Sequence, residues 1–270
     1  MSIPIIFFHA GDSDYLQYTL KQAVASNPNA DVYLLGDQFN EKYSSIVNHH
    51  MYDNFFDSVW DFKNKYVHLS TNDAAYEMIC IVRWFIMKDF CKRHNIDKFF
   101  YCDSDVMLYC DITEEQKKFA NYRCTMTHNI SAGITFINDL KVLDEYYDLC
   151  QRVYSKEDKF NFNKCKQHFE NLQANNRAGG VCDMTLWSIY RNIGNPGDYG
   201  ETSAIIDDST FDHNINGDDG YETEDGIKKV YWKDNKPYCK KIWLDRLIRF
   251  NCIHFQGQPA KALIPSFVRE

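Results

Sequence analysis

Two carboxylates, Asp103 and Asp105, lie one residue apart in the apolar stretch FFYCDSDVMLYC, residues 99–110. Burying an anionic side chain is costly unless a positive group accompanies it. Carboxylates at this spacing can reach one divalent cation, and oxygen ligands suit Mg²⁺ and Mn²⁺. Such a cation keeps positions open for a diphosphate and would neutralise its charge as it leaves. The pattern predicts a metal-dependent site for a diphosphate-linked substrate.

The same motif admits a second interpretation, a phosphatase of the haloacid dehalogenase type with Asp103 as nucleophile. Asp207 and Asp208, at the end of SAIIDD, could supply the later acidic pair of such enzymes. Two features disfavour this interpretation. That motif normally opens its domain, whereas three strand-like segments and a long helix precede it here. Met107 also stands where Thr or Val is expected.

A calcium loop is a third candidate, in DHNINGDDGYET, residues 212–223. Asp219 stands where an EF-hand has an apolar residue, and Thr223 stands where it has a bidentate Glu. A solvated acidic loop is therefore favoured. The part of the stretch that does follow the EF-hand order comprises Asp212, Asn214, Asn216 and Gly217.

The composition is that of a globular protein of one compact unit. The chain has 270 residues, of which 44% are hydrophobic and 25% charged, without repeats or a low-complexity linker. We expect a single domain over residues 1–270, with a nucleotide-type first half over about 1–110 and a more variable second half over about 111–270. The net charge of −8 disfavours nucleic acid as the main partner, because phosphate binding needs a basic surface.

The sequence also bears on location. Its start, MSIPIIFFHAGD, indicates a strand rather than a signal peptide. No stretch approaches the roughly 20 apolar residues that span a bilayer. The ten cysteines include no CxxC pair, so a cysteine zinc site or a redox motif is not indicated. Together these features predict a cytoplasmic protein without a membrane span, with peripheral membrane contact left open.

The first half alternates between strand-like and helix-like segments. We expect strands in IPIIFF, ADVYLLGD, YVHLS and KFFYCD. Helices are expected at about 15–25 and 72–94, the longer one opening with Ser70 and Asp73 at capping-box spacing. Strands separated by helices predict an α/β fold with a mixed, mostly parallel sheet flanked by helices.

The second half is less regular. Strands are expected in RCTMTH and SAGITFIN, helices at about 140–154 and 183–192, and a hairpin in KKVYWKDNKPYCKK. In a parallel sheet, ligands bind beyond the carboxyl ends of the strands. KFFYCDSD would therefore deliver Asp103 and Asp105 to such an edge.

With these pieces in order, the chain resembles nucleotide-sugar glycosyltransferases of the GT-A fold, most like the glycogenin and galactosyltransferase group called family 8. IPIIFFHAGDSDYL is similar to the first strand and nucleoside-binding loop of that group. IHFQGQPAK resembles its closing HFxGxxK, with one extra residue before Lys261. The resemblance makes His254 a third metal ligand beside Asp103 and Asp105, and imidazole suits Mn²⁺ alongside carboxylates.

The resemblance also implies donor contacts. Tyr15 would stack on the base, and Arg83, on the long helix, would approach the diphosphate. AGGVCDMTLW resembles the family's Gly-Gly-Asp-Gln helix start, with Asp183 as its acid and Met184 in place of Gln. Ser131, in SAG, stands where the family usually has Asn. The full set of expected donor-binding residues is His9, Ala10, Asp14, Tyr15, Arg83, Ser104, Gly257 and Lys261.

The resemblance implies a retaining transferase that uses Mn²⁺ or Mg²⁺ and a UDP-sugar. It also implies that residues 1–270 form a single GT-A catalytic domain, with the nucleotide-binding half over about 1–110 and the sugar and acceptor half over about 111–270. The acceptor, a glycan, lipid or protein, is not specified. Asp183 would position the sugar or stabilise the developing cation, or would act as the base if the enzyme inverts. A nucleotide-sugar-binding protein that has lost turnover is the remaining alternative.

Overall fold

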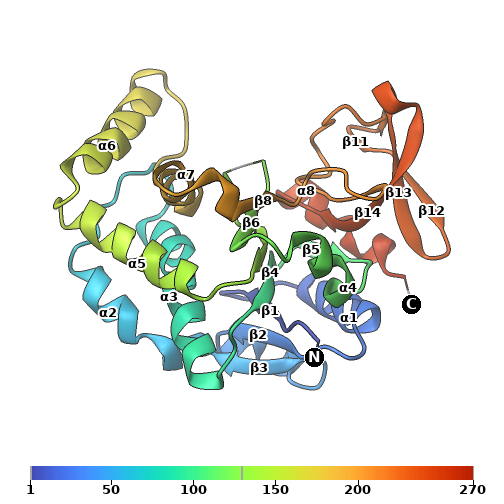
Figure 1. Ribbon diagram of the computed structural model, residues 1–270, viewed down its shortest axis with the longest axis horizontal. Helices are drawn as coiled ribbons and strands as arrows, with labels where there is room; N and C mark the ends of the chain where they lie inside the picture. The colour runs from blue at the N-terminus through green and yellow to red at the C-terminus, as the bar shows by residue number, and fades with distance from the viewer. Residues whose placement is uncertain (1, 129, 270) are drawn as a thin grey trace.

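The computed structural model describes residues 2–128 and 130–269. A seven-stranded sheet of order β3-β2-β1-β4-β7-β6-β8 forms its centre (Figure 1). Strands β3, β2, β1 and β4 are parallel, β7 is antiparallel to β4 and β6, and β8 is parallel to β6. The predicted mixed, mostly parallel sheet is confirmed. Its strands are β1 (Ile5–Phe8), β2 (Val32–Gly36), β3 (Asn48–Met51), β4 (Phe99–Asp103), β6 (Cys124–Met126), β7 (Ile134–Ile137) and β8 (Tyr199–Glu201).

Helices cover both faces of this sheet, which is why strands such as β1 and β2 have nearly continuous apolar sequences. In β1, Ile6 and Phe8 join one core, whereas Ile5 and Phe7 join the other. The first core contains side chains of α2 (Asp57–Lys63), α3 (Ala74–His94), α5 (Lys141–Tyr154) and α7 (Asp183–Ile193). The second contains side chains of α1 (Leu16–Ser26) and α4 (Ile112–Gln116). Helix α6 (Lys159–Ala174) contacts α5.

A second, five-stranded sheet lies beside the first and has the order β12-β13-β14-β5, with β9 paired to β14 (Figure 1). The predicted hairpin is confirmed as β12 and β13. The strands are β5 (Val106–Leu108), β9 (Ser209–Phe211), β12 (Val230–Lys233), β13 (Lys236–Lys241) and β14 (Arg246–His254). The smaller elements are β10 (Thr223–Glu224), β11 (Ile227–Lys228), α8 (Gln258–Lys261), η1 (Gln38–Tyr43), η2 (Tyr52–Phe55), η3 (Lys117–Phe119), η4 (Pro196–Asp198), η5 (Ile242–Leu244) and η6 (Ile264–Phe267).

The chain passes from one sheet to the other at the Asp-Ser-Asp turn. Strand β4 ends at Asp103, and β5 begins in the second sheet at Val106. Strand β14 runs antiparallel to β5, with His254 opposite Val106. The register therefore brings the closing His motif next to the carboxylates, although some 150 residues separate them in sequence.

Two expectations about elements were wrong, and other elements were missed. YVHLS is not a strand, and the third strand of the parallel run is Asn48–Met51, whose polar sequence NHHM gave no apolar signal. Helix α6 was not anticipated. Helix α3 begins with Asp73 as its N-cap, accepting from the amides of Ala75 and Tyr76, whereas the Ser70 hydroxyl donates to Glu77.

The ten cysteines are all free thiols; eight are buried, and Cys80 and Cys182 are half-buried. Within residues 2–128 and 130–269, no helix combines the length and apolar character needed to cross a bilayer.

Candidate metal and donor site

Asp103 is fixed by three neighbours at the end of β4. Its backbone amide donates to the carbonyl of Gly133 on the next strand at 2.8 Å. Its Oδ1 accepts from the Arg83 guanidinium and from the Tyr101 hydroxyl, each at 2.8 Å. A Cβ on Gly133 would lie 2.6 Å from Asp103 Oδ2, so only glycine allows β7 to approach this closely. Gly133 of the SAG motif therefore packs directly against the carboxylate of Asp103.

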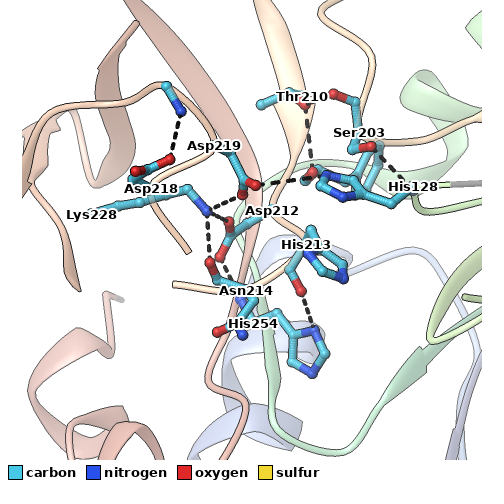
Figure 2. Close-up of polar contacts among 12 residues, drawn as sticks. His128, Ser203, Thr210, Asp212, His213, Asn214, Asp218, Asp219, Lys228 and His254 are labelled. Carbon is cyan, nitrogen blue, oxygen red and sulfur yellow. Dashed lines mark hydrogen bonds and ion pairs between the residues drawn. The ribbon is translucent and has the colours of Figure 1, made fainter. Parts of the chain in front are cut away.

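His254 faces Asp105 from the end of β14. Its Nε2 lies 3.3 Å from Asp105 Oδ1, and its Nδ1 lies 2.7 Å from the carbonyl oxygen of His213 (Figure 2). Its backbone amide donates to Asp212 at 3.1 Å. Because a carbonyl only accepts, Nδ1 carries a proton, and Nε2 holds the lone pair in the neutral ring. The backbone thus selects the tautomer that a metal requires.

The charges around Asp105 are coupled. Burial alone would lower the pKa of His254, but its hydrogen bond and charge interaction with Asp105 outweigh burial and raise it to about 9. Burial would raise the pKa of Asp105, yet His254 and Lys261 together hold it below its usual value. Lys261 Nζ lies 3.2 Å from Asp105 Oδ2. Without a metal, these cations balance the carboxylate.

The residues fit a divalent cation. One ligand atom from each of Asp103, Asp105 and His254 lies within 4.8 Å of the others. Two carboxylates and an imidazole are donors that Mn²⁺ and Mg²⁺ accept. Binding requires the neutral ring, so the metal displaces the proton of His254.

Arg83 joins the metal cluster to Asp183. Its guanidinium donates to Asp103 at 2.8 Å and to Asp183 Oδ2 at 2.5 Å. The Trp84 indole also donates to Asp183 Oδ2, and the amide of Met184 donates to Oδ1. Burial lowers the pKa of Arg83, but Asp183 and its other neighbours raise it well above its ordinary value. Arg83 therefore orients both acids as well as lining the cleft.

Asp183 reaches this network because two chain segments meet. It is the first residue of α7 and follows Gly180, which forms an antiparallel bridge with Ser70. A Cβ on Gly180 would lie 2.3 Å from the Leu69 carbonyl oxygen. Glycine at this position lets the α7 start pack directly against the segment that leads into α3.

A cleft of about 230 Å³ opens on the other side of the Asp-Ser-Asp turn. Ser104 lines it, and its hydroxyl oxygen lies 2.8 Å from His9 Nδ1 and 3.3 Å from the Tyr15 hydroxyl. Lys261 Nζ lies 5.2 Å from the centre of the Tyr15 ring. Burial lowers the pKa of His9. The lining of this cleft combines an aromatic ring, Ala10, an ammonium group and the carboxylates.

A second cleft, of about 420 Å³, shares Arg83 and Asp103 with the first. Its lining also includes His254 and residues of the segment 179–184, among them Asp183. Ser131 and Met184, which stand at the Asn and Gln positions of the resembled motifs, both line it. Asp103, Asp105, His254 and Arg83 thus line two adjoining clefts.

Two predicted donor residues lie elsewhere. Asp14 is exposed and does not line either cleft. Gly257 is exposed with φ +86°, at the start of the four-residue α8, and it also lies outside both linings. The acidic pair of the phosphatase interpretation is likewise absent from these clefts, since Asp208 pairs with Arg246 at 2.9 Å.

The loop with partial EF-hand order already contains a cation. Lys228 Nζ donates to Asp212 Oδ1 at 2.8 Å, to the Asn214 carbonyl at 2.6 Å and to Asp219 Oδ2 at 2.7 Å (Figure 2). These three bonds use every donor of the ammonium group. The calcium interpretation is therefore wrong, because an internal lysine occupies the centre of the loop.

Sequence reasoning missed four residues that hold the site. Tyr101 stands two positions before Asp103 on β4, so the period of the strand placed it on the same face. Trp84 adjoins Arg83 but gave no separate signal. The contacts of Asp212 and His213 with His254 depend on tertiary register alone.

No family model and no curated protein matches the chain. Among solved structures, mouse xyloside xylosyltransferase 1 is 11% identical, with 74% of this chain and 85% of that chain covered and a TM-score of 0.47. PaToxG glycosyltransferase is 13% identical, with coverage of 73% and 71% and a TM-score of 0.40. GlyE of Streptococcus pneumoniae TIGR4 is 15% identical, with coverage of 74% and 45% and a TM-score of 0.38. These likenesses do not establish an activity for this chain.

Proposed function

We propose that the chain is a metal-dependent GT-A glycosyltransferase. It moves a sugar from a nucleotide sugar, with a UDP-sugar favoured, to a glycan, lipid or protein acceptor. The observation that carries the proposal is the convergence of Asp103, Asp105 and His254, whose ligand atoms lie within 4.8 Å of one another between two clefts. The register of β14 against β5 creates this convergence.

Asp103, Asp105 and His254 would hold Mn²⁺ or Mg²⁺, which supplies charge neutralisation to the diphosphate leaving group. Lys261 contacts Asp105 and projects beside Tyr15, so its ammonium can bind a phosphate oxygen of the donor. Tyr15 offers a ring to the base, and Ser104 offers a hydroxyl in the lining of the cleft.

Asp183 fits a positioning role in a retaining reaction. Three donors, from Arg83, Trp84 and Met184, occupy most of the acceptor positions of its carboxylate. A carboxylate held in this way can orient the sugar and stabilise positive charge that develops on it. If the product is inverted, Asp183 becomes the candidate base. NMR comparison of the anomeric configuration of donor and product distinguishes the two.

The first experiment is calorimetric binding of UDP, GDP, CDP and ADP, with and without Mn²⁺. We expect one nucleotide to bind only with Mn²⁺ and to lose that binding in Asp105→Ala. Asp97→Ala removes an exposed carboxylate outside the cluster and serves as the matched control. Failure of a folded protein to bind any nucleotide would contradict the donor assignment.

Turnover separates the proposal from its alternatives. We expect release of the nucleoside diphosphate from one UDP-sugar, dependent on Mn²⁺ and on His254. Tight, Mn²⁺-dependent binding of a nucleotide sugar with neither transfer nor hydrolysis would instead indicate a binding protein. Hydrolysis of p-nitrophenyl phosphate that requires Asp103 but not His254 would favour the phosphatase interpretation.

A further inference from the structure

A second group of metal-binding side chains lies beside the first. His128 follows β6, His213 follows β9, and Asp219 lies in the loop that Lys228 fills; we call these three residues the His128 cluster (Figure 2). One ligand atom from each lies within 4.8 Å of the others. His128 Nε2 is 3.9 Å from Asp219 Oδ1, and the two imidazole rings are stacked with centroids 4.1 Å apart.

We propose that the His128 cluster binds a transition-metal ion such as Zn²⁺, separately from the cation held by Asp103, Asp105 and His254. Two imidazoles and one carboxylate form a common three-residue donor set for Zn²⁺. The first cluster has the opposite balance, two carboxylates and one imidazole, which suits harder cations such as Mn²⁺ and Mg²⁺. The two sites would therefore differ in metal preference.

Neighbouring groups prepare Asp219 for this role. Lys228 Nζ donates to its Oδ2 at 2.7 Å, and Lys241 Nζ donates to its backbone carbonyl. Oδ1 is left facing His128, as Figure 2 shows. The ammonium groups of Lys228 and Lys241 are balanced by the carboxylates of Asp212 and Asp219, so the surroundings are close to neutral before an ion binds.

Ion binding requires a small rearrangement. Zinc–nitrogen and zinc–oxygen bonds of about 2.0–2.2 Å in a tetrahedron place ligand atoms about 3.3 Å apart. The 3.9 Å between His128 and Asp219 must shorten by about half an ångström, and the stacked rings must tilt to aim at one point. The His128 side chain is 40% exposed, so its ring has room to turn. Its backbone amide is held by Glu201 at 2.9 Å.

The His128 cluster adjoins a cavity that could admit a further ligand. It is also connected to the first cluster by a hydrogen bond between His213 and His254. It borders a cavity of about 300 Å³ that Thr210, Tyr221 and Lys241 also line. Three protein ligands leave a fourth tetrahedral position open toward this cavity. The His213 carbonyl accepts from His254 Nδ1, so an ion on the His213 ring would also restrain the segment that orients His254.

The test is a calorimetric zinc titration of chelator-stripped protein, with Asp103→Asn used to weaken the first site. We expect two equivalents of Zn²⁺ in the wild type and one in Asp103→Asn. Adding His128→Ala or His213→Ala to Asp103→Asn should weaken the remaining zinc by more than about 100-fold, because even the neighbours of ligands contribute 10- to 100-fold. His68→Ala in the same background is the matched control, since His68 lies outside both clusters.

Two further measurements test folding of the variants and the coordination of the bound metal. Circular dichroism and thermal unfolding without metal establish that each variant folds. Co²⁺ bound to Asp103→Asn should give the strong visible absorption of four-coordinate cobalt, and His213→Ala should remove it. The proposal is overturned if Asp103→Asn binds no zinc, or if the His128→Ala and His213→Ala double variants bind zinc like their parent. Neither outcome depends on whether the chain transfers sugar.

Discussion

Two pairs of loop carboxylates in this chain face positive charge, and they differ in what supplies it. Asp212 and Asp219 surround the ammonium of Lys228, whose side chain is only 1% exposed. Asp103 and Asp105 instead meet Arg83, Lys261 and His254, which come from three different elements and remain accessible from the clefts.

The difference explains why similar acidic sequences have different roles. All three N–H donors of the Lys228 ammonium bond to oxygens of the 212–219 loop. The ammonium group therefore fills the centre of this loop and leaves no room there for an external cation. Around Asp105, the balancing charge includes a proton on His254, which a metal can displace. The centre of the 212–219 loop is therefore closed to an external cation, whereas the proton that balances Asp105 can be exchanged for a metal.

Asp105→Asn is expected to have the largest effect, because Asp105 belongs to the site where a metal can displace the proton of His254. The change preserves shape but removes one ligand and the partner of both His254 and Lys261. Loss of the several kcal/mol that a catalytic metal supplies should reduce UDP-sugar turnover by about 10³-fold or more. Steady-state assays across Mn²⁺ concentrations measure the change, with Asp97→Asn as the control. Activity retained at saturating Mn²⁺ would contradict the proposed metal role of Asp105.

Removing the cation of the 212–219 loop should instead lower the stability of the folded protein. Lys228→Met leaves Asp212 buried without its cation, and breaking a buried ion pair costs about 3–5 kcal/mol. Urea unfolding should report a decrease of that size in the free energy of unfolding. Lys261→Met is the matched variant at the other pair, and its partly exposed side chain predicts a loss of under about 1 kcal/mol but weaker donor binding. Equal destabilisation by both variants would remove the distinction drawn between the two loops.

Gly133→Ala tests how closely Asp103 must be placed. The added methyl would meet Oδ2 at 2.6 Å and displace the carboxylate from the cluster. A misplacement of about 1 Å at a reacting centre can lower turnover by about 10²-fold. Gly197→Ala, whose new methyl would meet only ordinary contacts, is the control. If kcat is unchanged while overpacking lowers stability, the glycine serves packing alone.

Sequence reasoning recovered the parts of the site that local pattern encodes. The DxD turn after a buried strand, the start of α7 at Asp183 and the long helix bearing Arg83 all lie where the apolar periodicity indicates. The parallel sheet followed from the alternation of strands and helices. Strand Asn48–Met51 was missed because it is a polar edge strand, for which periodicity gives no signal.

The contacts that the sequence did not reveal depend on register between distant segments. His213 holds His254 through its backbone carbonyl, a contact independent of side-chain type. Lys228, on β11, reaches the 212–219 loop through tertiary contacts, so the expected solvated loop instead has Asp212 buried against an internal ammonium group. Asp14 shows the converse, since the resemblance predicted a donor contact for it but it is exposed and lines neither cleft.

The smallest predicted effect concerns pH, and it distinguishes an exchangeable proton from a fixed ammonium group. Because Asp105 raises the pKa of His254 to about 9, Mn²⁺ must compete with a proton below that pH. The observed Mn²⁺ affinity should rise about tenfold per pH unit from 7 to about 9 and then level off. Calorimetric titrations across this range measure it. A flat profile would mean that His254 is not displaced from its proton by the metal.

The same proton gives stability the opposite dependence on pH when metal is absent. A pKa raised on folding stabilises the protein fully below the unfolded value near 6.5, and this contribution disappears as the pH rises through about 9. With a chelator present, the free energy of unfolding should therefore fall by at most about 3 kcal/mol between these limits. Saturating Mn²⁺ should remove that decrease, because the folded ring is then already deprotonated. His254→Gln should lack it under both conditions, and a decrease that persists in His254→Gln would assign the effect to another group.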